Sequence, residues 1–477
     1  MKPTSSVIRL RAGSNLAPIA VEVATTDRNG PLMARLRNRK WPLVAAVLML
    51  GLGMAFMFAW DPLIGHGSGW YVPADVWGIY RGAHYVGWGY LGGIYTSGNG
   101  IVSFPGMAVL LAPVAMLGGS LHLTESLTPF FVARPTAALL LQPIELLVAS
   151  TVVFSSDTLA ERLQCSRRRR AALSILIAIL AWPTAALWGH AEDALAMTLA
   201  ILALVAVFDG KWTKCGWLLG FAIATQPLVA MVVPVVIGAA PAGRRLLLAF
   251  RSLVLSAVLV GIALLGNAAE TYRALVDQPT PPSLNHATPW LWFAHVVPGS
   301  GAQAHQPATS GWRRLPSWNP VAHAHVMVAG GPGRMIDVIL AVVLGLYVWR
   351  RPQHAVRLLW LAAAVLASRC LFEAVMTPYY IAPPLFLALV LSARQSARRF
   401  WAAAVVALEI TVFAYHQLNP WVWWLPLVAG LTVILALGYP DDVPVMTERR
   451  AAGGVDLPGA GSVGPPSEPA GLLDPAV

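Results

Sequence analysis

One acidic and aromatic segment, Pro73-Ala-Asp75-Val-Trp-Gly-Ile-Tyr80-Arg81, follows a long apolar run. A carboxylate among aromatic side chains at a membrane edge is partly desolvated, which raises its affinity for a proton. Asp75 is therefore a candidate general base, and Asp61, at the end of the apolar run, is its competitor. Tyr80 and Arg81 are candidate substrate-binding residues beside it. The alternative role for Asp75 is an N-cap of the following helix, and its position alone favours neither role.

A second polar cluster, Trp188-Gly-His190-Ala-Glu192-Asp193, lies between two apolar runs. Glu192 and Asp193 begin the second run, where the dipole of a helix N-terminus stabilises anions. Capping accounts for part of this pattern, but it does not require three titratable groups within four residues. His190, Glu192 and Asp193 are therefore candidate substrate-binding residues.

A third group of basic and imidazole side chains lies mainly in a long polar stretch, 266–334. Arginine binds phosphate through bidentate hydrogen bonds, and histidine can also bind it. For any single histidine of this stretch, an exposed or hydrogen-bonded structural role is the favoured alternative, and Arg369 with Glu373 also fits a structural ion pair. No metal or other cofactor is expected, since His323 and His325 alone supply too few ligands. The candidate phosphate-binding residues are His286, Arg313, Arg314, His323, His325 and Arg369.

The composition requires membrane helices to position these side chains. Of the 477 residues, 57% are hydrophobic and only 12% are charged, and the mean hydropathy is +0.63. Soluble proteins carry about 25% charged residues, so soluble enzymes, disordered scaffolds and nucleic-acid binders are excluded as main interpretations. The three cysteines, Cys165, Cys215 and Cys370, have neither metal-ligand nor disulfide-motif spacing.

The net charge of +11 is concentrated in short basic runs between apolar segments. Such runs mark cytoplasmic loops, so the pattern predicts an all-α, multi-pass protein of the plasma membrane with about 10 to 12 membrane helices. The basic segment 1–40 and the tail 439–477 are expected in the cytoplasm, and the Pro, Gly and Ala content of the tail predicts disorder.

Three parts of the chain are not expected to be simple crossings. Residues 61–102 are rich in Trp, Tyr and Gly and are expected to form amphipathic helices on the outer face. The stretch 215–240 contains Pro227 and Pro234 and is expected to enter and leave the membrane on the cytoplasmic side. One segment between 103 and 166 must also fail to cross, because the alternation of basic runs otherwise breaks.

These features occur in an order that resembles the GT-C superfamily of membrane glycosyltransferases. The closest resemblance is to the actinobacterial polyprenol-phosphate-mannose-dependent mannosyltransferases of phosphatidylinositol mannoside and lipoarabinomannan assembly. It covers about residues 41–265, with 335–438 as further membrane helices. Gln226 stands where that family has lysine, and histidine follows Gly189. The resemblance rests on Asp75 and on Gly92-Gly-Ile-Tyr95, Ser103-Phe-Pro105, Leu111-Ala-Pro113, Gly189-His190 and Gly216-Trp-Leu-Leu-Gly220 leading to Gln226-Pro227.

The resemblance implies an inverting transfer of a sugar, mannose or arabinose, from a polyprenyl-phosphate donor on the extracytoplasmic face. The acceptor would be a glycolipid or polysaccharide. Asp75 would be the base and Gln226 would lie in the donor site. Two alternatives are a transporter or flippase of a lipid-linked intermediate and a non-catalytic membrane scaffold.

The orientation predicts that residues 266–334 are outside the cell. In intact cells, a cysteine that replaces Ser300 should therefore react with a membrane-impermeant maleimide, and a cysteine placed after residue 440 should react only once the membrane is permeabilised. The opposite labelling pattern would place the candidate residues in the other compartment.

Overall fold

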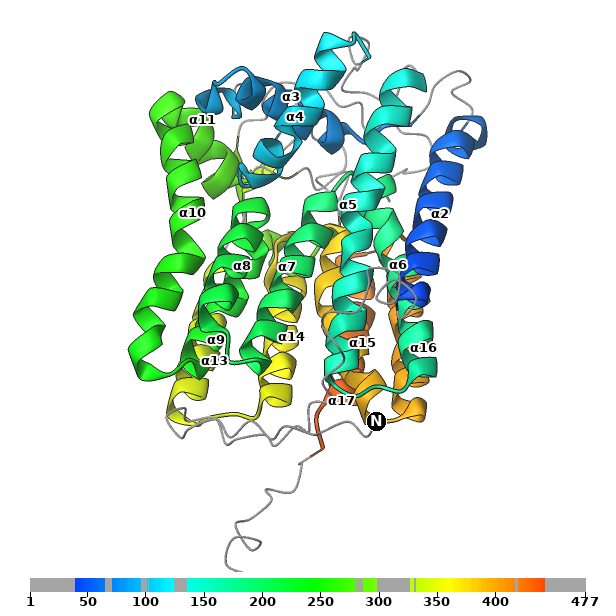
Figure 1. Ribbon diagram of the computed structural model, residues 1–477, viewed down its shortest axis with the longest axis vertical. Coiled ribbons are helices and arrows are strands. Elements are labelled where there is room, and N and C mark those ends of the chain that lie inside the picture. Colours follow the sequence, from blue (N-terminus) through cyan, green and yellow to red (C-terminus); the bar gives the residue numbers. More distant parts are fainter. Residues whose placement is uncertain are drawn as a thin grey trace, which may run out of the picture. The chain divides into compact units, whose positions relative to one another are not determined.

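The structure is a computed structural model that describes residues 39–64, 71–95, 101, 103–123, 135–278, 280, 286–297, 327–329, 332–416 and 419–441. The described residues up to Pro440 belong to one compact unit. Within the described residues of this unit, helices carry nearly all of the ordered structure (Figure 1).

Within the described residues, seven helices are long and apolar enough to cross a membrane. The prediction of an all-α membrane protein is therefore confirmed, while the count of about 10 to 12 membrane helices stays a prediction. Five shorter or less apolar helices pack among the seven: α8 (Trp212–Thr225), α9 (Val233–Ala239), α13 (Gly333–Arg350), α15 (Ala382–Gln395) and α16 (Ala397–Ala414). The seven are α2 (Lys40–Ile64), α5 (Pro135–Arg162), α6 (Arg167–Ala186), α7 (Ala191–Phe208), α10 (Arg245–Gly266), α14 (Ala355–Phe372) and α17 (Pro420–Gly438).

Helix α4 (Gly106–Ser120) lies between 103 and 166 and is shorter than the candidate spans, so the failure of one segment there to cross stays a prediction. This helix packs against α3 (Ala74–Gly87), and both lie at the top of Figure 1, while α5 provides the span. The hydroxyl of Tyr80 on α3 donates a hydrogen bond to the carbonyl of Ala115 on α4, at 3.1 Å. One helix thus forms in the Trp- and Tyr-rich stretch, and a second lies against it.

The stretch around 215–240 is a broken pair of helices. Helix α8 ends before Gln226, and the 3-10 helix η2 (Pro227–Val232) leads into α9. Trp212, at the start of α8, and Arg244, after α9, line the same surface depression. The pair therefore begins and ends at one end of the bundle, while its entry and exit on the cytoplasmic side stay a prediction.

Basic side chains meet at that same end, which is called the basic end below. Arg39 and Arg170 both pair with Asp157 and Glu161, and Arg170 lies 2.8 Å from Asp157. Arg162 pairs with Asp209 on the C-terminal side of α7. The basic runs thus converge in space, as alternating crossings require. Which compartment this end faces stays a prediction.

The opposite end, called the site end below, carries the short connections. The strand β1 (His286–Ala287) pairs antiparallel with β4 (Val375–Met376), and β4 leads into the 3-10 helix η6 (Pro378–Ile381). A second antiparallel pair joins β2 (His295–Val297) to β3 (Met327–Ala329). The helix α11 (Ala268–Tyr272) continues from α10 at this end (Figure 1).

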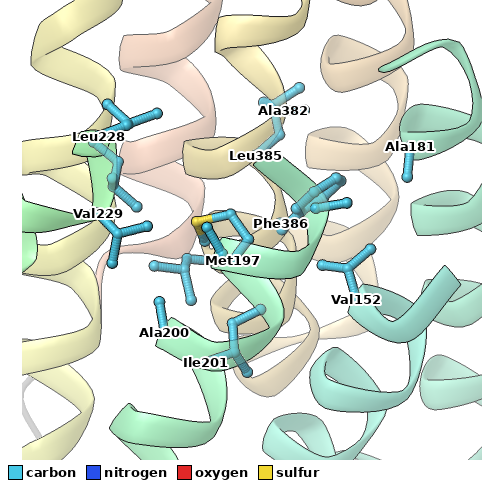
Figure 2. Packing of buried hydrophobic residues seen from close by; sticks show 14 of the residues in the cluster. Val152, Ala181, Met197, Ala200, Ile201, Leu228, Val229, Ala382, Leu385 and Phe386 are labelled. Atoms are coloured by element: carbon cyan, nitrogen blue, oxygen red, sulfur yellow. The ribbon is translucent and has the colours of Figure 1, made fainter. Parts of the chain in front are cut away.

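Apolar side chains from α5, α6, α7, η2 and α15 fill the centre of the bundle. Figure 2 shows Met197 of α7 between Val229 of η2 and Phe386 of α15. Phe386 is only 2% exposed and Met197 is 1% exposed. This close-packed apolar core supports the polar site end, because rigid neighbours are needed to hold buried charges in place.

Glycines allow α9 and α13 to touch backbone to backbone. A Cβ atom at Gly345 would lie 2.6 Å from the carbonyl oxygen of Pro234, and one at Gly238 would lie 2.3 Å from that of Gly345. Small residues are used in this way where membrane helices approach closely.

Gly345→Ala is expected to separate these helices and to lower the free energy of unfolding by about 1–3 kcal/mol, as overpacking does. Thermal unfolding in detergent measures the loss. The matched control is Gly261→Ala on α10, where an added Cβ would meet nothing within 4 Å. Equal midpoints for the two variants would show that the contact does not constrain the bundle.

Candidate functional site

His190 joins two carboxylates at the site end. Its Nε2 lies 3.1 Å from Oδ2 of Asp75 on α3, and its Nδ1 lies 2.6 Å from Oε1 of Glu192 on α7. The imidazole is almost fully buried and the Glu192 side chain is completely buried, whereas the Asp75 side chain is 42% exposed. A ligand can therefore reach this group from the side of Asp75.

A glycine allows the close approach of α3 to the turn between α6 and α7. Gly189 has a φ of +75°, and a Cβ there would lie 2.7 Å from side-chain atoms of both Pro73 and Val76. This contact places the first turn of α3 directly over His190. The N-cap position of α3 is Pro73, so the interpretation of Asp75 as the N-cap is wrong. Asp75 lies in the first turn, where the helix dipole also favours a carboxylate.

Asp193 is held from the broken pair of helices. The side-chain amide of Gln226 donates a hydrogen bond to Oδ1 of Asp193, and both residues are buried. Gln226 is in extended conformation at the C-terminal end of α8, and Pro227 begins η2. The break that the prolines impose is therefore what turns this amide toward α7.

Glu145 on α5 is a member of the cluster that sequence reasoning missed. It is 2% exposed, accepts a hydrogen bond from the backbone N–H of Ala191 and interacts electrostatically with Glu192 and His190. It therefore satisfies one of the free N–H groups at the start of α7 from a neighbouring helix. A glutamate inside an apolar run was the available signal, because a charged residue is rarely placed in a span without a role.

Several acceptor oxygens in this cluster have no hydrogen-bond partner among the described residues. They are Oε2 of Glu145, Oε2 of Glu192 and Oδ2 of Asp193. A buried acceptor without a donor costs about 1–3 kcal/mol, more if it is charged. Three buried carboxyl groups of the cluster therefore keep hydrogen-bonding capacity that no described residue uses.

Aromatic and basic groups from the α14–α15 connection close the other side. The ring of Tyr379 stacks on His190, with centroids 4.2 Å apart, and Trp188 lies 5.7 Å from Tyr379. Arg369 lies over the ring of Tyr380, at 3.9 Å, and interacts electrostatically with Asp193. Sequence reasoning did not assign Tyr379 to a site. In the structure it joins the α14–α15 connection to His190 and Trp188.

Glu373 separates two arginines at the edge of this cluster. It lies 3.0 Å from Arg334 and 3.7 Å from Arg369. The expected pair of Arg369 with Glu373 is therefore present, and Arg334 adds a second cation. Both arginines therefore face carboxylates, since Arg369 also interacts electrostatically with Asp193.

His286 is placed near this connection but outside the His190 group. It is buried, its ring stacks on Trp423 with centroids 4.1 Å apart, and it faces Met376 across the β1–β4 pair. Thr288 donates a hydrogen bond to the carbonyl of Glu373 at 2.6 Å. This segment therefore supports the Glu373 region from the side.

The remaining sequence candidates either make their described contacts elsewhere or lie outside the described part of the structure. Tyr80 is buried against α4, and Arg81 lies over the Trp77 ring at 5.2 Å. Asp61 belongs to the last turn of α2, but its side chain is outside the described part of the structure. Arg313, Arg314, His323 and His325 lie outside the described residues.

The charges around His190 determine its protonation. Burial lowers the pKa of the imidazole, but the carboxylates of Glu192 and Asp75 outweigh burial and raise the pKa well above its usual 6.5. Burial, and then the neighbouring Tyr380, Asp193 and Asp75, raise the pKa of Tyr379. At neutral pH the site therefore holds an imidazolium against a neutral phenol.

The fold and this cluster define a helical membrane protein with ionisable groups buried at one end. No group of three or more His, Cys, Asp or Glu side chains within the described ranges is arranged to hold a metal ion. No protein-family model matches the chain, and no curated protein matches it either.

Because the pKa of His190 is raised, its contribution to the free energy of unfolding should depend on pH. Protonation of the imidazole stabilises the fold fully below about pH 6.5, and this stabilisation is lost as the pH rises through the higher pKa of the folded state. His190→Gln should therefore destabilise the protein most near pH 6, and the difference in thermal midpoint from wild type should narrow toward alkaline pH.

The control is the exposed His416, whose replacement by Gln is expected to leave the midpoint close to wild type. A difference for His190→Gln that widens as the pH rises would mean that the folded protein holds His190 neutral.

Proposed function

We propose that the protein is an integral-membrane glycosyltransferase that moves a sugar, mannose by resemblance, from a polyprenyl-phosphate donor to a glycolipid or polysaccharide acceptor. The observation that carries the proposal is the half-exposed carboxylate of Asp75, held by a buried His190 beside unpartnered carboxylate oxygens. The sequence resemblance to GT-C enzymes names the same aspartate independently.

Asp75 acts as the general base in this proposal. The acceptor hydroxyl loses its proton to Asp75 while its oxygen forms the new bond to the anomeric carbon. The bond from that carbon to the donor phosphate oxygen breaks, and the electron pair leaves with the phosphate. The phosphate leaves as a stable anion, so no strong acid is needed, and attack opposite the leaving group inverts the anomeric configuration.

His190 acts through Asp75 as a positioning residue. Its Nε2 contact holds the carboxylate of Asp75 in one orientation. Glu192 in turn fixes the imidazole.

The unpartnered oxygens fit a sugar better than an apolar ligand. Glu145, Glu192 and Asp193 each have one acceptor oxygen without a donor among the described residues, and sugar hydroxyls are donors. Arg369 and Arg334 provide cations at the edge of the cluster, where a donor phosphate would lie. If the basic end is cytoplasmic, as the basic runs predict, the site end faces the extracytoplasmic side.

A second candidate is a flippase or transporter of a lipid-linked intermediate. The observation that favours it is the position of Glu145 and Asp193, which lie within two of the candidate spans with oxygens unpartnered by any described residue. Carboxylates inside membrane helices are typical of proton and ion pathways. Transfer assayed with the solubilised protein separates the candidates, since a flippase leaves the donor sugar on its carrier.

Asp75→Asn keeps the shape of the side chain but cannot take up the proton, so transfer is expected to fall about 10²- to 10⁴-fold. The variant should still fold and bind donor. The measurement is sugar transfer by purified protein, together with the glycolipid profile of cells that lack the gene and carry each variant.

Asp61→Asn is the control and is expected to have a milder effect. Loss of transfer in Asp61→Asn with normal transfer in Asp75→Asn would assign the base to Asp61. Normal transfer in both variants would contradict the mechanism.

A further inference from the structure

A surface depression of about 250 Å³ lies at the basic end, far from the His190 cluster along the helices. It is formed where the start of α8 meets the start of α10, and its lining residues are Trp212, Thr213, Arg244, Leu247, Leu248 and Arg251. Two arginines, a hydroxyl and apolar side chains thus share one concave surface.

The two arginines carry positive charge that the protein does not neutralise within its described part. Arg251 donates a hydrogen bond to the hydroxyl of Thr213, at 2.9 Å, and Arg244 is exposed. Neither guanidinium pairs with a carboxylate of the described residues. Arg245 differs, because it lies over the Trp349 ring at 4.6 Å and donates to the carbonyl of Ala240 at 2.9 Å.

The first turn of α8 adds backbone donors to the same depression. Helix α8 begins at Trp212, and its N-cap residue, Lys211, makes no side-chain capping hydrogen bond. The first N–H groups of a helix have no intrahelical acceptor, and the dipole makes this end positive. An anion in the depression would meet the helix terminus and both arginines together.

Beside the depression, α8 and α10 present apolar side chains outward. Phe221 is 51% exposed on α8, and Leu246 and Phe250 are 86% and 59% exposed on α10. Both helices belong to the bundle, so these exposed apolar side chains are suited to contact lipid acyl chains. A ligand with an anionic head and long apolar chains matches both surfaces.

We propose that this depression binds the phosphate headgroup of an anionic phospholipid. Arg244 and Arg251 contact the phosphate oxygens, and the acyl chains lie along the outward faces of α8 and α10. Close packing keeps the two helices in register for this role: a Cβ at Gly220 would lie 2.5 Å from the carbonyl oxygen of Arg251. Basic pockets between membrane helices bind anionic headgroups in this manner.

The test uses the purified full-length protein in detergent, titrated with a short-chain phosphatidylglycerol while the thermal midpoint is followed. Phosphatidylcholine of the same chain length tests the charge, and inorganic phosphate tests a soluble anion as the ligand. We expect phosphatidylglycerol to raise the midpoint saturably, and the other two probes to act only at much higher concentration.

The variants are the single substitution Arg244→Gln and the double variant that also carries Arg251→Gln. Loss of each arginine should weaken phosphatidylglycerol binding about fivefold, as expected for a cation at a lipid surface. Arg251→Lys keeps the positive charge, so it separates an effect of lost charge from an effect of lost folding. The control is Arg351→Gln, which removes an exposed arginine that does not line the depression.

Three outcomes would overturn the proposal. Equal binding of phosphatidylcholine would remove the role of charge. Phosphatidylglycerol binding that is unchanged in the double variant would exclude the two arginines. Inorganic phosphate that binds as tightly as phosphatidylglycerol would make the ligand a soluble anion.

Discussion

The imidazole of His190 lies between two carboxylates in a part of the protein that is almost closed to solvent. Removing charged groups from water costs several kcal/mol for each ion, and that cost is recovered only with good geometry and further hydrogen bonds. Here Asp75 and Glu192 bond to the two ring nitrogens, and Tyr379 stacks on the ring. The left-handed turn at Gly189, the start of α3 and the start of α7 must all be in place for this group to form.

The two ends of the bundle differ in whether their carboxylates have partners. At the basic end, Asp157 and Glu161 are bound by two arginines, and Asp209 is paired with Arg162. At the site end, Glu145 and Asp193 each retain an oxygen without a donor among the described residues. Ion pairs between helices hold the helices together. Carboxyl oxygens without a partner can form hydrogen bonds with a ligand that reaches them. The basic end is therefore suited to hold helices together, and the site end keeps hydrogen-bonding groups that the described residues do not use.

Breaks in helices are what bring the polar groups to the site. Pro227 ends the regular course of α8, and Gln226 uses the break to reach Asp193. The α14–α15 connection is likewise irregular, and it carries both Glu373 and Tyr379. Irregular backbone at membrane depth is tolerated where it is buried in protein or lines a polar cavity. The same breaks thus serve both the packing and the proposed transfer of a sugar.

Local sequence patterns were sufficient for the helices and for part of the site. Apolar run length marked the seven spans, because a fixed rise per residue must match the membrane thickness. The cluster of His190, Glu192 and Asp193 was found because the three residues are neighbours in the chain, and Asp75 because it follows an apolar run. Only the tertiary structure added Glu145 and Tyr379 and removed Tyr80 from the cluster. Glu145 on α5 contacts Ala191 at the start of α7, and Tyr379 in the α14–α15 connection contacts His190. Hydropathy and spacing report on which residues share a helix face, whereas such contacts depend on how helices pack, which no local pattern encodes.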